Sequence, residues 1–288
     1  MTVRRRPVPL GAGAPLPAVR THTATTPDRA EGVPTPLRIS YGGDGSQLGE
    51  LHLPAGTDPV PVVVVVHGGY WRAVYGFDLG TPLAADLANH GVAAWNVEYR
   101  RVGGGGGWPA TFTDVAAAVD ALAGPVQEAA GGRLDLADVR AVGHSAGGHL
   151  AVWAAGRPLL PAGAPGADPV VRLTRVVSQA GVLDLVTASA EGLSDGASDE
   201  LLDGSAGARP ERYALAAPLA RLPIGLAVTC VHGDADVDVP ISQSETYVSA
   251  ATAAGDPATL LRLPGVDHLA LIDPSARAWA ACREALLR

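Results

Sequence analysis

Short apolar runs alternate with amphipathic stretches along most of this chain. Residues 37–41 and 48–53 each alternate apolar and polar side chains, which predicts a half-solvated antiparallel hairpin. Residues 62–66 form an unbroken run of valines, typical of a strand buried on both faces. A helix is expected over residues 79–90, closed by Gly91. These elements already suggest a layered α/β arrangement.

The same reading continues to the C-terminus. Further strands are expected at residues 92–97, 139–142, 175–178, 226–231 and 259–263. Further helices are expected at residues 114–123, 146–155 and 241–254, and from Ser275 onward. Strands that alternate with helices predict a mostly parallel central sheet with helices on both faces.

Three segments interrupt the rhythm and define the expected domain organisation. Residues 1–34 are rich in proline, and although Arg4, Arg5 and Arg6 suggest a leader, the prolines break any apolar signal core. We therefore expect a flexible extension followed by one domain over residues 35–288. Residues 103–107 are five glycines, which predict a flexible loop. Residues 184–222 are too long for an ordinary connection and predict a cap-like insertion over one edge of the sheet.

Composition narrows the classes of function. The net charge of −8 argues against nucleic acid or an anionic membrane as partner. The chain contains no lysine, which excludes Schiff-base chemistry and serine–lysine dyads. Cys230 and Cys282 are too few for a disulfide framework, and no apolar stretch reaches the length of a membrane span. We expect a cytoplasmic protein with a small-molecule partner, and a homodimer is compatible with the sequence.

The strongest chemical signal is Gly143-His144-Ser145-Ala146-Gly147, between a predicted strand and a predicted helix. Flanking glycines allow a sharp turn from which the serine hydroxyl projects at the helix N-terminus. This context predicts that Ser145 is the nucleophile of a serine hydrolase with an α/β-hydrolase fold. The alternative is a glycine-rich turn with an incidental serine.

A second loop, His67-Gly68-Gly69-Tyr70-Trp71, follows the buried valine strand. Glycines at the end of a strand allow backbone N–H groups to face a negative oxygen, as a tetrahedral intermediate requires. By analogy with related loops, the N–H groups of Gly69, Tyr70 and Ala146 are expected to form an oxyanion hole. His67 is expected to anchor the loop rather than act as a base. Tyr70 and Trp71 are candidates for the substrate pocket, or else pack in the core.

The nucleophile needs a base, and the chain offers eight histidines. His268 follows the last predicted strand in a loop that can fold back over the sheet edge. The other histidines have less suitable positions: His22 in the extension, His52 on an exterior strand, His90 at a helix end, His144 beside the serine and pointing elsewhere, His149 inside a helix, and His232 at a strand end. We therefore expect His268 to be the base.

An acid must hold the histidine in the correct tautomer. The stretch His232-Gly233-Asp234-Ala235-Asp236-Val237-Asp238-Val239-Pro240 offers three aspartates, and Asp236 has the common spacing to Val239-Pro240. Asp234 and Asp238 are expected in turns or caps, and Asp267 is too close to His268 in sequence. The resulting order of serine, aspartate and histidine is the order expected for α/β-hydrolases.

These motifs resemble the kynurenine formamidase (arylformamidase) branch of the α/β-hydrolases. The resemblance rests on the two loops, with Gly148-His149-Leu150 extending the motif around Ser145, and runs from about Ile39 to His268. It implies the triad Ser145, Asp236 and His268 and hydrolysis of N-formylkynurenine, a step of tryptophan catabolism. The long extension and the five-glycine loop depart from that branch.

Three functions follow from this reading. The first is an arylformamidase-like amidase that removes a formyl or small acyl group from an arylamide. The second is a carboxylesterase for short-chain esters, because small carboxylesterases share the same loop. The third is a ligand-binding protein that kept the fold and lost catalysis. None of the three calls for a metal or an organic cofactor.

Overall fold

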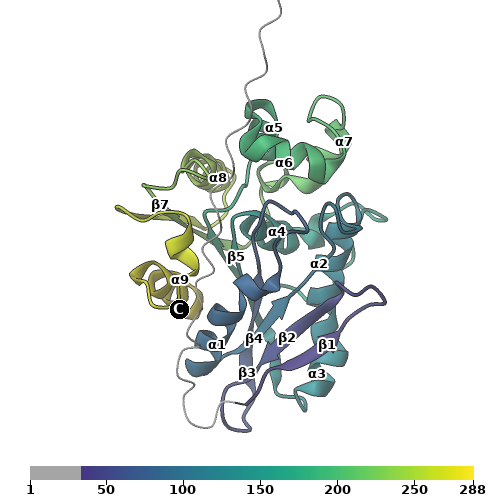
Figure 1. Cartoon of the computed structure of the whole chain (residues 1–288), viewed down its shortest axis with the longest axis vertical. Helices are drawn as coiled ribbons and strands as arrows, with labels where there is room; N and C mark the ends of the chain where they lie inside the picture. The colour runs from purple at the N-terminus through teal and green to yellow at the C-terminus, as the bar shows by residue number, and fades with distance from the viewer. Residues whose placement is uncertain (1–33) are drawn as a thin grey trace, which may run out of the picture.

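The computed structural model describes residues 34–288, so the predicted N-terminal extension lies almost wholly outside the described residues. One eight-stranded sheet runs through the molecule in the order β1-β2-β4-β3-β5-β6-β7-β8 (Figure 1). Its strands are β1 (Leu37–Ser40), β2 (Leu48–His52), β3 (Val60–Val66), β4 (Ala93–Val97), β5 (Leu134–His144), β6 (Arg175–Gln179), β7 (Ala227–Gly233) and β8 (Ala258–Leu263).

The sheet is mostly parallel, as the sequence predicts. The β1–β2 and β2–β4 pairs are antiparallel, and every other neighbouring pair is parallel. The predicted hairpin is confirmed by the register that pairs Leu37 with Leu51. The strands β4, β3, β5, β6, β7 and β8 all run in the same direction. Their carboxyl ends therefore lie at one edge of the sheet.

Helices cover both faces of this sheet. The helices are α1 (Thr81–Asn89), α2 (Ala110–Asp120), α3 (Pro125–Ala129), α4 (Ala146–Ala155), α5 (Leu185–Glu191), α6 (Leu193–Leu202), α7 (Pro210–Ala216), α8 (Ser242–Ala253) and α9 (Arg277–Leu287). Short 3₁₀ turns add η1 (Phe77–Leu79), η2 (Ala121–Ala123), η3 (Arg157–Leu159), η4 (Pro218–Arg221) and η5 (Leu269–Ile272).

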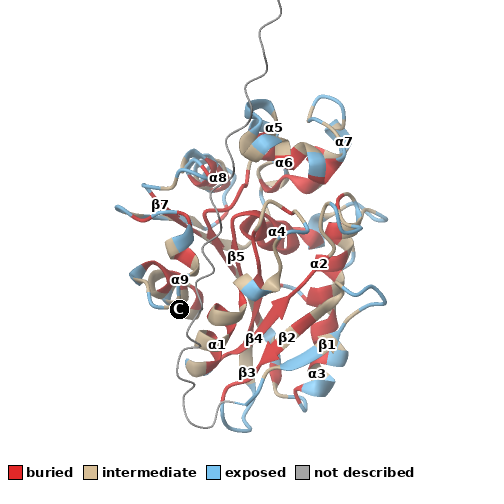
Figure 2. Ribbon diagram, viewed as in Figure 1, coloured by how far each residue is buried: buried red, intermediate tan, exposed pale blue. Residues whose placement is uncertain are grey.

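The valines of β3 are buried on both faces of the sheet. Val62, Val64 and Val66 belong to one apolar cluster with residues of α2, α4 and α8. Val63 and Val65 belong to a second cluster with residues of α1 and α9. Successive side chains of a strand point to opposite faces, so a strand covered on both sides must be apolar at every position. Figure 2 shows the resulting buried strands beneath more exposed outer helices.

The segment 184–222 folds into α5, α6, α7 and η4. In Figure 1 the helices α5, α6 and α7 form the top of the molecule, beyond α4 and the sheet. We call residues 184–222 the cap. Helix α6 contains an irregular turn, because Ser194, Asp195 and Gly196 all have left-handed backbone angles.

Several elements differ from those that the sequence predicts. Strand β5 begins at Leu134 rather than residue 139, and helix α2 begins at Ala110 rather than residue 114. Helix α3 was not expected, because five residues are too few to show a helical period. His52 lies on a strand near the edge of the sheet but is buried, with 3% of its surface exposed. Alternation in the sequence does not reveal that a neighbouring segment covers that side chain.

Two further expectations concern location. No helix in residues 34–288 is long and apolar enough to cross a membrane. Cys230 and Cys282 are both buried free thiols. The expected cytoplasmic location stays a prediction.

A buried carboxylate joins three elements near the hairpin. Asp114 of α2 accepts hydrogen bonds from Arg100 Nε at 2.8 Å, Arg100 Nη2 at 2.7 Å and Gln47 Nε2 at 2.7 Å. Burial alone would raise the pKa of Asp114, but the bonds from Arg100 and Gln47 bring it below its usual value. Asp114 therefore stabilises the fold in its charged form.

We predict that Asp114→Ala lowers the free energy of unfolding by about 3 kcal/mol at pH 7. This is the low end for a broken buried pair, because the side chain of Arg100 is partly exposed to water. The folded pKa lies below the unfolded value of about 3.9, so the contribution is full above that pH and is lost as the pH falls below it. Urea unfolding at pH 7 and pH 3 measures both effects. The exposed Asp58→Ala is the control, and equal losses for the two variants at pH 7 would contradict the prediction.

Candidate active site

Ser145 lies at the sharp turn between β5 and α4, as the sequence predicts. Its φ of 55° and ψ of −118° are rare for a residue with a side chain and cost about 1–3 kcal/mol. The turn is held because Ser145 N donates to the carbonyl of Gln179 at 2.8 Å. At Gly147 a Cβ atom would collide with the backbone carbonyl of Val66, so this position of the motif requires glycine. Ser145 keeps only 5% of its surface exposed.

The second loop packs directly against this turn. A Cβ atom on Gly68 would lie 2.7 Å from His144 O and 3.2 Å from Ser145 Cβ. Beyond it Tyr70 and Trp71 each have a φ of 56°. In residues 34–288, the N–H groups of Gly69, Tyr70 and Ala146 donate to no other group. The oxyanion hole formed by these three N–H groups stays a prediction.

His67 anchors the beginning of this loop, as expected. Its Nε2 donates to Glu98 Oε1 at 3.0 Å, and its ring stacks on Tyr99 with centroids 4.4 Å apart. Burial alone would raise the pKa of Glu98, but the bonds from His67 and the Tyr99 N–H, with the charge of Arg101, lower it. A charged, fully bonded carboxylate thus holds the imidazole in place, away from Ser145.

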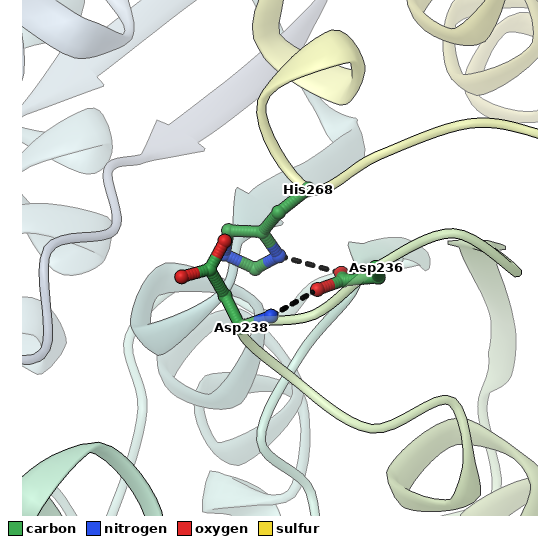
Figure 3. Close-up of side chains that lie close together, drawn as sticks. All are labelled: Asp236, Asp238 and His268. Carbon is green, nitrogen blue, oxygen red and sulfur yellow. Dashed lines mark hydrogen bonds and ion pairs between the residues drawn. The ribbon is translucent and has the colours of Figure 1, made fainter.

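The structure brings Asp236 and His268 together. His268 Nδ1 donates to Asp236 Oδ2 at 2.6 Å, although 32 residues separate them (Figure 3). Asp236 Oδ1 accepts the N–H groups of Asp238 and Val239, each at 2.9 Å. Burial would raise the pKa of Asp236, but hydrogen bonds from His232 and His268 bring it well below its usual range. Asp236 is therefore a charged acceptor aimed at His268.

In the described part of the chain, the Ser145 hydroxyl has no hydrogen bond to the His268 ring, whose Nδ1 is bonded to Asp236. Such contacts are often long in free enzymes and tighten when substrate binds. The histidine and the aspartate are thus joined directly, and Ser145 lies at the adjoining turn.

Two histidines support this pair in ways that sequence reasoning missed. His232 Nε2 lies 3.3 Å from Asp236 Oδ2, and its Nδ1 bonds to the Ser244 hydroxyl at 2.8 Å. His144 Nε2 donates to the His268 carbonyl at 3.0 Å, and the two rings lie 4.3 Å apart. Burial lowers the pKa of His144 to about 3, so it stays neutral. The expectation that His144 points elsewhere is wrong, and its neighbours in sequence carry no sign of this contact.

The remaining aspartates have separate tasks. Asp234 Oδ1 accepts Gly265 N at 2.7 Å and holds a turn, as expected. Asp267 Oδ1 accepts Ala270 N at 2.9 Å, a role that the sequence did not predict. Asp238 is not a capping residue. Its exposed carboxylate accepts the Tyr70 hydroxyl at 3.4 Å.

Asp236, Asp238 and His268 place oxygen and nitrogen atoms within 4.8 Å of one another, a spacing that could hold a cation (Figure 3). The contacts of Asp236 fit a different role. One of its oxygens faces two histidines and the other accepts two backbone N–H groups. Its lone pairs are therefore already engaged, as suits an acid that orients a histidine.

A small pocket opens beside Ser145. Its enclosed volume is about 10 Å³, close to what one water molecule needs. The lining is mostly apolar and comes from both the core and the cap: Tyr70, Trp71, Ser145, Ala146, Val182, Ala188, Leu193, Ser194, Ala197, Ser198 and Val239. Both aromatic candidates thus reach the pocket, although Trp71 is also buried and donates from Nε1 to His149 Nδ1 at 3.1 Å.

Comparison with known sequences identifies a family model and a relative. The family model BD-FAE matches residues 50–250, which is more than half of the chain. Esterase LipC of Mycobacterium tuberculosis is 28% identical over 246 residues, a match that spans 80% of this chain and 59% of that protein. The matched region is therefore less than two thirds of the length of this curated relative.

Solved structures support the same fold. Esterase B from Lactobacillus rhamnosis is 21% identical, with a TM-score of 0.74 over 88% of this chain and 84% of that one. A thermophilic esterase from Thermogutta terrifontis is 23% identical, with a TM-score of 0.69 over 87% and 90%. A bifunctional GH43-CE protein from Bacteroides eggerthii is 24% identical, with a TM-score of 0.67, but only 35% of it is covered.

These relatives change one expectation from the sequence. They support the α/β-hydrolase superfamily but not the kynurenine formamidase branch. The sheet order and the site geometry agree with the predicted fold. The chain therefore belongs to the BD-FAE family, a family of esterases with the α/β-hydrolase fold.

Proposed function

We propose that this protein is a serine carboxylesterase that hydrolyses esters of short acyl chains. The observation that carries the proposal is the strained turn at Ser145, which lines a small pocket. The neighbouring residue His144 binds the carbonyl of His268, whose ring is bonded to Asp236. Family membership favours an ester over an amide as substrate.

The lining of the pocket favours an apolar acyl group, because its walls are largely apolar. Structures of the thermophilic Thermogutta terrifontis esterase have been solved with propionate and with butyrate bound. Acyl groups of that size are our proposal for this chain.

The proposed mechanism has two halves. His268 removes the proton of Ser145 as the serine oxygen attacks the ester carbonyl, and Asp236 holds the imidazole and stabilises its charged form. The N–H groups of Gly69, Tyr70 and Ala146 receive the oxyanion, and one such donor is worth roughly 3 kcal/mol. Protonated His268 then gives its proton to the leaving alcohol. Water attacks the acyl-enzyme by the same route and releases the acid.

We predict that Ser145→Ala lowers kcat for p-nitrophenyl acetate by at least about 10⁴-fold, because the nucleophile is lost. Steady-state hydrolysis measures the loss. The control is Ser249→Ala on the exposed side of α8, which should match the wild type. Activity of Ser145→Ala within tenfold of the wild type would refute the assignment of the nucleophile.

Asp236→Asn tests the acid. We expect kcat to fall by about 10⁴-fold, because an amide can favour the wrong tautomer of His268. Asp238→Asn, in the same loop, should keep kcat within about tenfold, since Asp238 contacts Tyr70 rather than the Nδ1 side of His268. Kinetics of both variants distinguish the two aspartates. A larger loss for Asp238→Asn would reverse the assignment.

The leaving group separates the two enzymatic interpretations. We predict that kcat/KM for p-nitrophenyl acetate or butyrate exceeds that for N-formylkynurenine by at least about 100-fold. Parallel assays on one preparation measure the ratio. If the formamide is the better substrate, the arylformamidase interpretation replaces ours. If neither class turns over while the protein is folded, the ligand-binding interpretation replaces both.

A further inference from the structure

Two irregular backbone segments contribute residues to the lining of the pocket. Tyr70 and Trp71, in the loop after β3, both have a φ of 56°. Ser194 and Asp195, in the cap, have φ values of 54° and 56°. Residues with side chains rarely adopt this region because it strains the backbone, so neighbouring groups must hold both segments.

One guanidinium joins the two segments. Arg72 directly follows Trp71, and its Nη2 donates to the carbonyls of Ser194 at 3.1 Å and Asp195 at 3.4 Å. Its Nε donates to Glu200 Oε2 at 2.8 Å, one and a half turns further along α6. The planar fork of arginine suits this geometry, because separate N–H groups reach the carbonyls and the carboxylate together.

Arg72 is itself held firmly on the core side. The N–H of Val102 donates to Trp71 O at 2.8 Å, and the N–H of Ala73 donates to Val102 O at 2.9 Å. The guanidinium also lies over the Tyr70 ring, 5.9 Å from its centroid. The side chain of Arg72 therefore connects the loop after β3 to the cap, and the position of this loop determines the position of the cap residues that Arg72 binds.

The cap segment that Arg72 holds forms one wall of the pocket. Leu193, Ser194, Ala197 and Ser198 all line the cavity that also contains Ser145 and Ala146. If the turn at residues 194–196 relaxed to ordinary helix, these side chains would shift together. The width of the pocket thus depends on contacts outside it.

We propose that Arg72 is a positioning residue that selects short acyl chains by holding the cap wall against the loop after β3. The proposal rests on the proposed esterase function and deepens it. Arg72 does not touch the reacting atoms in this scheme. It acts through the position of residues 193–198.

The test measures kcat/KM for p-nitrophenyl acetate, butyrate, hexanoate and octanoate in the wild type, Arg72→Met and Arg72→Lys. We expect Arg72→Met to raise the octanoate-to-acetate ratio by about tenfold, because a released wall admits additional methylenes. Arg72→Lys should give an intermediate ratio, since one ammonium cannot replace all the donors of the fork. Amides of residues 194–198 should also exchange hydrogen faster in Arg72→Met than in the wild type.

Arg209→Met is a matched control. Arg209 also binds a left-handed cap residue, through the carbonyl of Asp203 at 2.9 Å, but does not reach the pocket. The octanoate-to-acetate ratio of kcat/KM in this variant should equal that of the wild type. If Arg72→Met does not fold, Glu200→Ala provides the test, because it removes the carboxylate partner from an exposed position and should shift the ratio in the same direction.

The outcomes separate this inference from the proposed function. A wild type that hydrolyses no ester would refute the esterase function. An active wild type whose ratio is unchanged in folded Arg72→Met, or whose rates fall equally for all four esters, would refute the role of Arg72 alone. A shift of the ratio in Arg209→Met equal to that in Arg72→Met would also refute it, because the effect would then belong to the whole cap.

Discussion

The active-site region depends on the close backbone contact between β3, β5 and the start of α4. Gly147 lies so near the carbonyl of Val66 that no side chain fits between them. This contact forces the chain to reverse within one residue, and Ser145 takes the strained conformation as a result. Burial of the central strands on both faces holds the turn. Packing of the core therefore holds the Ser145 hydroxyl in a position that the same turn would not keep in an isolated peptide.

The polar groups behind Ser145 form a second, connected layer. Asp236 lies between His232 and His268, while His144 supports His268 from the other side through its carbonyl. Such a buried network is costly unless its members are paired. Hydrogen bonds from His232 and His268 keep Asp236 charged, and burial keeps His144 neutral. The orientation of His268 is thus determined by three elements of the sheet edge at once, which leaves its ring little freedom.

Polar contacts connect the loop after β3 to the cap and to α4. Arg72 connects the loop after β3 to α6, and Trp71 connects the same loop to α4 through His149. His149 Nε2 in turn donates to the carbonyl of Ala216 at the end of α7. The loop expected to stabilise the oxyanion therefore also contacts the cap. In the proposed mechanism, catalysis and substrate selection thus depend on the same loop.

The sequence by itself determined the fold class and the chemically marked residues. The valine run, the alternating hairpin and the glycines around Ser145 are local patterns, and each reflects a physical need that acts within a few residues. The spacing within residues 232–240 likewise predicts Asp236 as the partner of His268, and the structure shows the hydrogen bond between them.

Tertiary structure alone decided the contacts between distant segments. His144 meets His268 across 124 residues, and Arg72 meets Ser194 across 122. Neither pairing leaves a periodic or spaced signal, because hydrophobic patterning shows which side of an element is buried but not which group lies opposite. The left-handed turn in α6 is invisible for the same reason: a distant guanidinium stabilises it, and the local sequence does not encode that contact.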